Sequence, residues 1–420
     1  MVAIVTMCFI FAMISFVTNM AAPFGNIWGN QYPWSKMAGN LMNFAAYLFM
    51  GIPAGKMLLK IGYKNTTLVA LATGFVGIVI QWISSKVTGG SAIYIYLLGA
   101  FVCGFCVCML NTVVNPMLNI LGGGGNKGNQ YIKIGGTLNS LTGTLTPLLV
   151  GALIGTVTAS TSMSDVAPLL FIAMGVFALA FVIISLVKIP EPAKERNATV
   201  YEHSAWNFRH FVLGAIAIFF YVGIEIGIPS QVNFFLADAS SKGAGIAVNG
   251  AAIGGAIAAI YWLLMMVGRM CSTFISGKVS TRTQMISVCT VAIVLVLIAI
   301  FIPKTVTVNM PGYSAADGFA MFQVPLSCLL LVLCGLCTSV MWGAIFNLAV
   351  EGLGKYTEAA SGIFMMLVVG GGIMPFIQEL IAKGPAGYMN SYWLVIAMLC
   401  YLLYYALVGC KNVNKDIPVD

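Results

Sequence analysis

The sequence predicts an all-α integral membrane protein with twelve transmembrane helices arranged as two six-helix bundles. Of its 420 residues, 60% are hydrophobic and only 8% are charged, whereas soluble globular chains carry about 25% charged residues. Apolar runs of the roughly 20 residues that a helical crossing requires recur along the whole chain. One long charged segment near the middle separates six such runs from six others. A soluble protein is therefore excluded, and the lipid bilayer is the expected solvent of these helices.

Residues 1–188 are expected to form the first bundle and residues 210–410 the second. The spans of the first bundle are predicted at 3–28, 36–56, 66–86, 92–121, 131–157 and 166–188. Those of the second are predicted at 210–237, 249–276, 281–302, 323–352, 357–382 and 388–410. Because prolines end the sixth span, residues 189–209 are predicted to be a cytoplasmic linker, and residues 411–420 a cytoplasmic tail.

The positions of the cations predict the topology. With the N-terminus in the cytoplasm, fourteen lysine and arginine residues lie on the inner side. Only five lie on the outer side: Lys36, Lys86, Lys242, Lys304 and Lys383. This excess follows the positive-inside rule, so both termini are expected to be cytoplasmic. We expect a monomeric multi-pass protein of the bacterial cytoplasmic membrane. The net charge of +8 is explained by the cations that mark the inner side of the membrane. It therefore does not indicate a nucleic-acid partner.

The sequence shows no cluster of residues that carries catalytic chemistry. It contains no recognisable nucleophile–base pair, metal-ligand cluster or phosphate-binding motif, so an enzyme, a metal site and a cofactor are not expected. The eleven cysteines lie mostly inside apolar runs, where a thiol packs as a small hydrophobe. The glycine run at 122–125 lacks the Lys and Ser/Thr of a phosphate loop. It is interpreted as a flexible connection.

Amide side chains inside the predicted spans are the candidates for substrate binding. In hydrocarbon, an amide must be satisfied by another helix, by water in a cavity or by a ligand. Amides both donate and accept hydrogen bonds, so they suit the hydroxyls of a sugar, while an aromatic face suits its C–H surface. The alternative is that the amides hold helices together. The candidates are Asn19, Asn43, Asn111, Asn115, Asn139, Gln231, Asn233, Trp342, Asn347 and Gln378, with Tyr221, Tyr261 and Trp262 as the other aromatic residues nearby.

Glu225 lies near the middle of the seventh span and is the candidate for cation coupling. A carboxylate that is protonated in one conformation and ionised in another is the minimum requirement for proton coupling. The alternative is that Glu225 is a fixed partner for a polar group on the eighth or the eleventh span. Arg269, in the eighth span, must reach the interface or pair with an acid. Glu351 and Glu358 are its predicted partners. Together with Lys64 these three residues are predicted to act in gating.

Several strings resemble the fucose/glucose/galactose:proton symporter family of the major facilitator superfamily. They include PAGKMLLKIGYK at 53–64, NTVVNPMLNILG at 111–122, FRHFVLGAIAIFFYVGIEIGIPS at 208–230 and FNLAVEGLGKYTEAASG at 346–362. The resemblance covers nearly the whole chain. It implies the major facilitator fold and import of a hexose or deoxyhexose by alternating access, coupled to a proton or a sodium ion.

The chain departs from this family at two positions that bear on coupling. The family has an aspartate on the first helix and a glutamate on the fourth, where this chain has Asn19 and Asn111. An amide cannot carry a proton at physiological pH, so coupling here requires Glu225 or is absent. The alternatives to a proton-coupled importer are an uncoupled sugar facilitator and an exporter of drugs or metabolites with the same fold. A membrane-bound sugar sensor is a third, but the chain has no signalling module.

Overall fold

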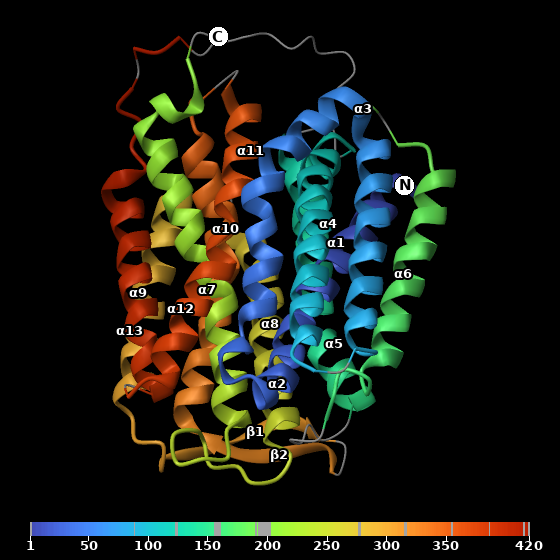
Figure 1. The fold of residues 1–420 in the computed structure, drawn as a ribbon. Coiled ribbons are helices and arrows are strands. Elements are labelled where there is room, and N and C mark those ends of the chain that lie inside the picture. Colours follow the sequence, from blue (N-terminus) through green and yellow to red (C-terminus); the bar gives the residue numbers. More distant parts are fainter. Residues whose placement is uncertain are drawn as a thin grey trace.

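The computed structural model is a bundle of long helices (Figure 1). It describes the whole chain except residues 1, 88, 122–124, 155–160, 190, 192–202, 276–278, 315–316, 354–355, 386, 415 and 419–420. The helices of the first half are α1 (Val2–Asn19), α2 (Ala21–Gln31), α3 (Ala38–Ser84), α4 (Ser91–Leu121), α5 (Gly125–Ile154) and α6 (Ala167–Leu186). Those of the second half are α7 (Arg209–Ala237), α8 (Gly250–Ile275), α9 (Thr281–Phe301), α10 (Leu326–Val350), α11 (Thr357–Leu367), α12 (Gly370–Lys383) and α13 (Gly387–Tyr404). The short elements are the 3-10 helices η1 (Pro33–Ser35) and η3 (Ala205–Asn207), the π-helical turn η5 (Tyr405–Gly409), and the strands β1 (Thr307–Ser314) and β2 (Gly318–Pro325).

The helical membrane architecture predicted from the sequence is confirmed. Among the described residues, ten helical segments are long and apolar enough to cross a membrane. The two predicted spans outside this set are 36–56, most of which forms the first part of α3, and 131–157, most of which lies in α5. The 47 residues of α3 add up to about 70 Å of helical rise. This is enough for two crossings of a hydrocarbon core about 30 Å thick. The structure is therefore consistent with twelve crossings.

Helix α3 contains a sharp bend at Gly62, where the chain turns back (Figure 1). Gly62 has φ 84° and ψ 173°, a conformation that only glycine adopts readily. The carboxylate of Glu191 caps the helical segment that follows. Its Oε2 accepts a hydrogen bond from the Tyr63 N–H at 2.6 Å, and its Oε1 accepts one from the Lys64 N–H at 3.0 Å. The bend thus joins two predicted spans within one element.

Two other predicted spans are each divided between two helices. The span predicted at 3–28 is divided between α1 and α2, because Pro23 has no N–H to bond the carbonyl of Asn19. The span predicted at 357–382 is divided between α11 and α12. At the start of α12, Gly370 packs against the backbone of Phe219 in α7, where a Cβ atom would collide with the Phe219 carbonyl.

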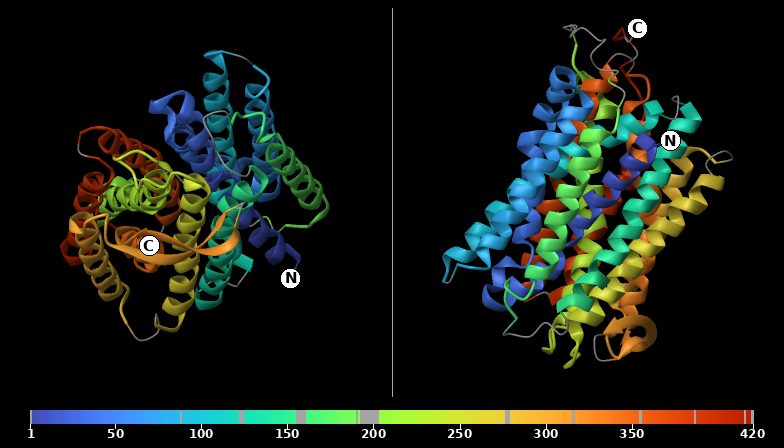
Figure 2. Two further views of the ribbon diagram at one scale, coloured as in Figure 1. Left: turned by 90° about the horizontal axis from the view of Figure 1, so that it is seen from below. Right: turned by 90° about the vertical axis from the view of Figure 1, so that its right-hand side faces the viewer.

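A two-stranded antiparallel hairpin precedes α10 and was not predicted. Strand β1 pairs with β2 in a register that places Met310 opposite Phe322, and Gly318 at the turn has φ 67°. The tenth span, predicted to begin at 323, therefore begins at Leu326. Figures 1 and 2 place the hairpin at the end of the bundle opposite the C-terminus. We call these the hairpin end and the C-terminal end.

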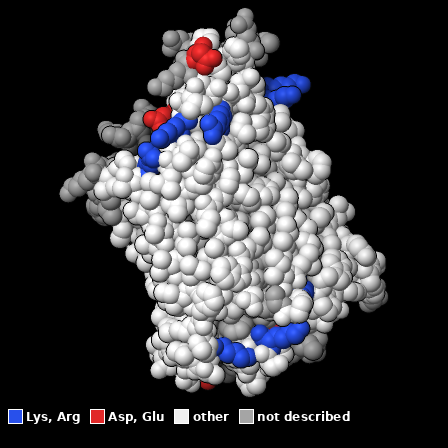
Figure 3. Space-filling view, turned by 90° about the vertical axis from the view of Figure 1, so that its left-hand side faces the viewer, with Lys and Arg blue, Asp and Glu red and all other residues white. Residues whose placement is uncertain are grey.

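The two halves of the chain meet mainly along three pairs of helices. Helix α5 packs against α8, and α3 packs against α11 and α12. In the view along the bundle, the helices of each half lie together on one side (Figure 2). Figure 3 shows one face of the molecule, with Lys and Arg side chains near both ends and an uncharged belt between them. All eleven cysteines are free thiols, and nine of them are buried.

Candidate functional site

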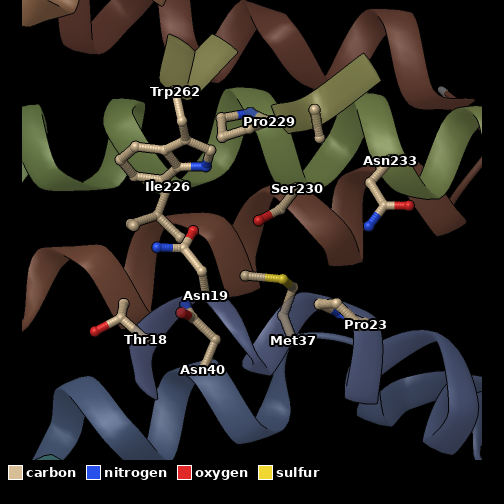
Figure 4. Close-up of a pocket in the computed structure, with 11 residues that line it drawn as sticks. Thr18, Asn19, Pro23, Met37, Asn40, Ile226, Pro229, Ser230, Asn233 and Trp262 are labelled. Atoms are coloured by element: carbon tan, nitrogen blue, oxygen red, sulfur yellow. The ribbon is translucent and has the colours of Figure 1, made fainter. Parts of the chain in front are cut away.

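A small cavity lies between the two halves, and its lining carries polar groups but no charge (Figure 4). Helices α1, α2 and α3 and the residue before α3 supply one wall, and α7 and α8 supply the other. The cavity volume is about 30 Å³, room for about two water molecules. Its lining residues are Thr18, Asn19, Pro23, Met37, Asn40, Ile226, Pro229, Ser230, Asn233, Ala258 and Trp262. Of the sequence-predicted residues, Asn19 and Asn233 thus face each other across this cavity.

Trp262 of α8 reaches the cavity because a glycine of α5 leaves room for it. A Cβ atom on Gly143 would lie 3.1 Å from Ser15 Oγ, 3.2 Å from Trp262 Cδ2 and 3.3 Å from Asn19 Nδ2. Asn19 Nδ2 donates to the Ser15 carbonyl at 2.9 Å and to its hydroxyl at 3.1 Å, which fixes the amide. Figure 4 shows the indole ring of Trp262 beside the Asn19 amide. The cavity therefore combines an oriented amide with an aromatic face.

Three polar contacts join the halves around the cavity. Asn26 Nδ2 donates to Asn233 Oδ1 at 3.3 Å, and Lys36 Nζ donates to the Tyr388 hydroxyl at 3.2 Å, both toward the hairpin end. Asn40 Nδ2 donates to the Gly371 carbonyl at 2.7 Å, and Figure 4 shows Asn40 beside Asn19, toward the other end. The sequence predicted Lys36 on the outer side, but nothing in the sequence indicated that Tyr388 would be its partner.

Lys36 also lies among the aromatic and acidic groups of the second half. Its Nζ is 5.2 Å from the ring centroid of Phe234 and 5.8 Å from that of Tyr388. Asp238 follows α7 in the same region. Burial raises its pKa, but hydrogen bonds from Ser240, the positive charge of Lys36 and a hydrogen bond with Tyr388 hold the pKa of Asp238 below its ordinary value. Asp238 is therefore a carboxylate at neutral pH and favours the docked Lys36.

Glu225 and Arg269 form an ion pair toward the other end of the cavity. Arg269 Nη2 lies 3.6 Å from Glu225 Oε1, and the two side chains are 18% and 13% exposed. The Tyr221 hydroxyl donates to Glu225 Oε1 at 3.0 Å. Arg269 Nη1 also donates to the Gly136 carbonyl at 2.7 Å and to Ser140 Oγ at 2.9 Å, both in α5. Arg269 therefore contacts both halves of the chain.

This ion pair corrects the partner predicted for Arg269. Glu351 is exposed just after α10, and its carbonyl contacts His210 Nε2 at 2.9 Å. The side chain of Glu358 lies outside the described residues. Glu225 is close enough because α7 and α8 pack together, a neighbourhood that spacing along one helix cannot reveal.

Three predicted amides of the first half bond within that half. Asn111 Nδ2 donates to the Tyr47 hydroxyl of α3 at 2.8 Å, and Asn115 Nδ2 donates to the Asn111 carbonyl at 3.1 Å. Asn139 Nδ2 donates to the Phe11 carbonyl of α1 at 2.9 Å. All three are half-buried and none lines the central cavity. The bonds of Asn111 and Asn139 are the helix-joining role that the sequence left as the alternative, whereas the bond of Asn115 stays within α4.

Three other predicted residues lie away from the central cavity. Asn43 lines a second, smaller cavity within the first half, where its Nδ2 lies 3.5 Å from the Ala100 carbonyl. Trp342 packs against Tyr221 and Phe364, with ring centroids 6.1 and 5.9 Å apart. Asn347 is exposed on α10.

The predicted glutamines sit beside an acid that sequence reasoning missed. Gln231 Nε2 donates to Glu379 Oε2 at 2.9 Å, and Lys383 Nζ lies 3.2 Å from Glu379 Oε1. The Glu379 side chain is 1% exposed. Gln378 Nε2 lies 3.4 Å from Ser391 Oγ. Glu379 falls inside the predicted span 357–382, four residues before Lys383, so the i,i+4 pairing rule could have identified it.

Lys64 anchors a loop rather than joining the halves. Its Nζ donates to the carbonyls of Ser185 and Val187 at 2.8 and 3.0 Å. With the cap from Glu191, these bonds hold the bend of α3 to the end of α6. Ser185 and Val187, the two acceptors of the Lys64 ammonium, both belong to the first half.

Comparisons with known proteins agree with this architecture. The family model of the Major Facilitator Superfamily matches residues 2–375. The chain is 30% identical over 377 residues to a glucose/galactose transporter of Brucella abortus biovar 1 (strain 9-941), which covers 88% of this chain and 84% of that protein. It is 21% identical over 418 residues to the L-fucose-proton symporter of Escherichia coli (strain K12), covering 90% and 88%. A crystal structure of the transporter FucP in the outward conformation has the same fold, with a TM-score of 0.70, 17% identity, and coverage of 97% of this chain and 99% of that one.

Proposed function

The chain belongs to the major facilitator superfamily, and from this membership we propose that it carries a hexose or deoxyhexose across the bacterial cytoplasmic membrane by alternating access. The observation that carries the proposal is the uncharged polar cavity between the halves. Substrate sites of such transporters lie near the midplane at the interface of their repeats. The chain acts as a transporter without catalysis, and its cargo is a small neutral molecule.

The cavity chemistry supports a sugar more than an apolar drug. Asn19, Asn40 and Asn233 offer amide groups that donate and accept hydrogen bonds, which matches neighbouring hydroxyls. Trp262 offers a flat aromatic face for the C–H surface of a pyranose ring. An exporter of apolar compounds would need a larger and more apolar pocket. The relatives named glucose/galactose transporter and L-fucose-proton symporter support the same substrate class.

Transport requires this cavity to enlarge. Its volume of about 30 Å³ admits water but no hexose, so the described conformation is closed around the site. Lys36 and Asn26 join the halves at the hairpin end through single polar contacts to the second half. We assign the hairpin end to the outer side and the C-terminal end to the cytoplasm. Breaking these two contacts would then open the site to the outside.

We propose import driven by a proton that binds Glu225. Glu225 lies one residue before Ile226, which lines the cavity, and it is 13% exposed. The L-fucose-proton symporter supports proton use in preference to sodium. An uncoupled facilitator is the second candidate, because Asn19 and Asn111 stand where the resembling family has acids.

The experiment is uptake into liposomes that contain the purified protein. Radiolabelled glucose, galactose and fucose should each be tested with an imposed inward proton gradient, with no gradient, and with sugar preloaded inside. Saturable uptake that the gradient stimulates supports a coupled importer. Exchange without stimulation supports the facilitator. Absence of saturable uptake and of exchange for all three sugars would overturn the proposed function.

A further inference from the structure

We infer that Pro375 orients the Asn40 amide for sugar binding, because it leaves the Gly371 carbonyl free to accept the hydrogen bond that fixes this amide. The inference rests on the proposed function and deepens it, since it assigns Asn40 the role of hydrogen-bond acceptor for a sugar hydroxyl. Asn40 lines the cavity and Pro375 does not, so Pro375 is a positioning residue that acts through Asn40. The two residues belong to opposite halves of the chain, on α3 and α12.

Pro375 interrupts the hydrogen bonding of α12. It lies in the second turn of this helix, which begins at Gly370. In an α-helix each N–H donates to the carbonyl four residues earlier, and for position 375 this is the carbonyl of Gly371. Proline has no N–H, so Gly371 lacks its ordinary helical donor. Both residues are buried, where a carbonyl that has lost its donor costs free energy.

Asn40 of the first half donates to this carbonyl. Its Nδ2 lies 2.7 Å from the Gly371 oxygen, and the residue is 3% exposed. Glycine at position 372 allows α12 to lie this close to α3. A Cβ atom on Gly372 would lie 2.8 Å from Phe44 Cβ and 3.0 Å from the Leu41 carbonyl. The donor that is missing from one half of the chain is thus supplied by a side chain of the other half.

This hydrogen bond also decides which part of the Asn40 amide is available in the cavity. A backbone carbonyl can only accept, so the atom that faces Gly371 must be the donating Nδ2. Among the described residues, no donor bonds Asn40 Oδ1. Oδ1 is therefore available as an acceptor for a ligand in the cavity that Asn40 lines.

Asn19 is oriented in the same way beside Asn40 (Figure 4). Its Nδ2 donates to the carbonyl and to the hydroxyl of Ser15, which leaves its Oδ1 as an acceptor as well. Two neighbouring amide oxygens suit two neighbouring hydroxyls that donate, as a sugar provides. Pro375 and Ser15 thus fix the acceptors of one wall from outside the cavity lining.

Pro375→Ala tests this role, because alanine restores the helical N–H that can bond Gly371. Asn40 then loses its exclusive partner and its amide is free to rotate. We expect the KM of sugar exchange in liposomes to rise roughly 2- to 10-fold, the range that one hydrogen bond contributes. The maximal rate should stay within about two-fold, and Tm should be unchanged or higher because alanine favours a helix interior. A purely structural role of Pro375 would instead lower Tm or the maximal rate.

A double-mutant cycle shows whether Pro375 acts through Asn40. Asn40→Ala should lower Tm by several degrees in the wild-type background, because the Gly371 carbonyl loses its donor. In the Pro375→Ala background the same substitution should lower Tm much less. The KM of the double variant should equal that of Asn40→Ala alone. If Asn40→Ala cannot be purified, recovery of folded protein by the added Pro375→Ala supports the inference equally.

Asn43→Ala is the matched control for the cycle. Asn43 is a second buried asparagine of α3, three residues further on, and its Nδ2 lies 3.5 Å from the Ala100 carbonyl in the first half. Its substitution should change Tm by the same amount in the wild-type and Pro375→Ala backgrounds.

The inference is overturned if the Tm changes of Asn40→Ala and Pro375→Ala add, if the double variant fails to fold, or if Pro375→Ala leaves KM unchanged. The Tm cycle needs no sugar, so its outcome is independent of transport. A non-additive cycle without uptake or exchange of glucose, galactose or fucose would refute the proposed function and uphold the link between Pro375 and Asn40. Sugar uptake with additive Tm changes would do the reverse.

Discussion

At the scale of single residues, Trp262 and Asn19 bring the two halves together around Gly143. The sequence offered both Trp262 and Trp342 as aromatic residues near the amides, and the structure places Trp262 in the cavity and packs Trp342 against Tyr221 and Phe364. Aromatic contacts of this kind contribute about 0.5–1.5 kcal/mol beyond area burial. A sugar platform at Trp262 can therefore be distinguished from one at Trp342 by substitution.

Trp262→Ala should raise the KM of sugar exchange by roughly 2- to 10-fold, the equivalent of 0.5–1.5 kcal/mol. Trp262→Phe should retain part of the affinity because a ring remains. Trp342→Ala is the comparison and should leave KM within about two-fold of wild type. Exchange kinetics measured in liposomes decide which of the two tryptophans contacts the sugar. A rise in KM confined to Trp342→Ala would show that Trp342 is the platform.

Replacement of Glu225 tests coupling at the same scale. Glu225→Gln keeps the size of the side chain but cannot bind and release a proton. We expect proton-driven accumulation of sugar to be lost while exchange of sugar across a membrane without a gradient continues. Measuring accumulation and exchange in the same liposomes separates a loss of coupling from a loss of sugar binding. Continued accumulation by the variant would assign the coupling proton to another group, and Glu379 would be the next acid to examine.

At the scale of elements, the bend of α3 depends on one backbone conformation and one cap. Gly62 has φ 84°, and a Cβ atom there would collide with the Glu191 carboxylate that caps the next segment. Strained backbone of this kind costs about 1–3 kcal/mol per residue when a side chain is present. The bend, the cap and the end of α6 form one connected unit.

Gly62→Ala should therefore lower the free energy of unfolding by about 1–3 kcal/mol. Gly55→Ala is the matched control in the same helix, since no atom lies within 4 Å of a Cβ built at that position. That substitution should be neutral or stabilise by about 0.5–1 kcal/mol. Thermal unfolding of both variants in detergent provides the comparison. Equal melting temperatures would contradict the importance of the bend.

The contacts of Lys36 at the hairpin end also act between elements. They join the segment between α2 and α3 to α7 and α13. Lys36→Met keeps the aliphatic stem but removes the ammonium that bonds Tyr388. We expect the cavity to open more often to that side. A cysteine at Ser230, in a background with exposed Cys271 and Cys400 replaced, should then react several-fold faster with an impermeant maleimide.

The control for this closure is Lys86→Met. Lys86 is another cation predicted on the outer side, and its Nζ lies 5.8 Å from the ring of Trp82. Both residues belong to the first half, so this substitution should leave the labelling rate unchanged. If both variants accelerate labelling equally, the effect is one of surface charge rather than of the Lys36 contact.

At the scale of the whole molecule, a ligand that binds in the cavity between the halves should stabilise the folded protein. A ligand at 100 times its Kd adds about 2.7 kcal/mol of stability. The described cavity lining has no charged side chain, so a neutral hexose should raise Tm by several degrees. Glucuronate and glucose 6-phosphate should not, because nothing in the lining balances their charge. Equal shifts for neutral and charged sugars would contradict the neutral-substrate assignment.

The helical spans could largely be read from the sequence, because hydrocarbon demands long apolar runs whose backbone bonds are internal. Their interruptions were less visible. The prolines and glycines are visible in the sequence, but the neighbouring backbone that packs against them is not. The division between α11 and α12, for example, lies where Gly370 packs against the backbone of Phe219. The hairpin was missed because its short strands adjoin the long apolar run of α10.

Membership of a membrane-spanning helical class, the succession of spans and the presence of buried amides and an acid followed from composition and periodicity alone. Only the tertiary structure decided which of these groups meet. It paired Arg269 with Glu225 and α5, placed Asn19 opposite Asn233, and bonded Asn111 to Tyr47. The reason is physical. Spacing along one helix determines a shared face, but contacts between helices depend on rotation and close approach, which residues such as Gly143 and Gly136 control from another helix.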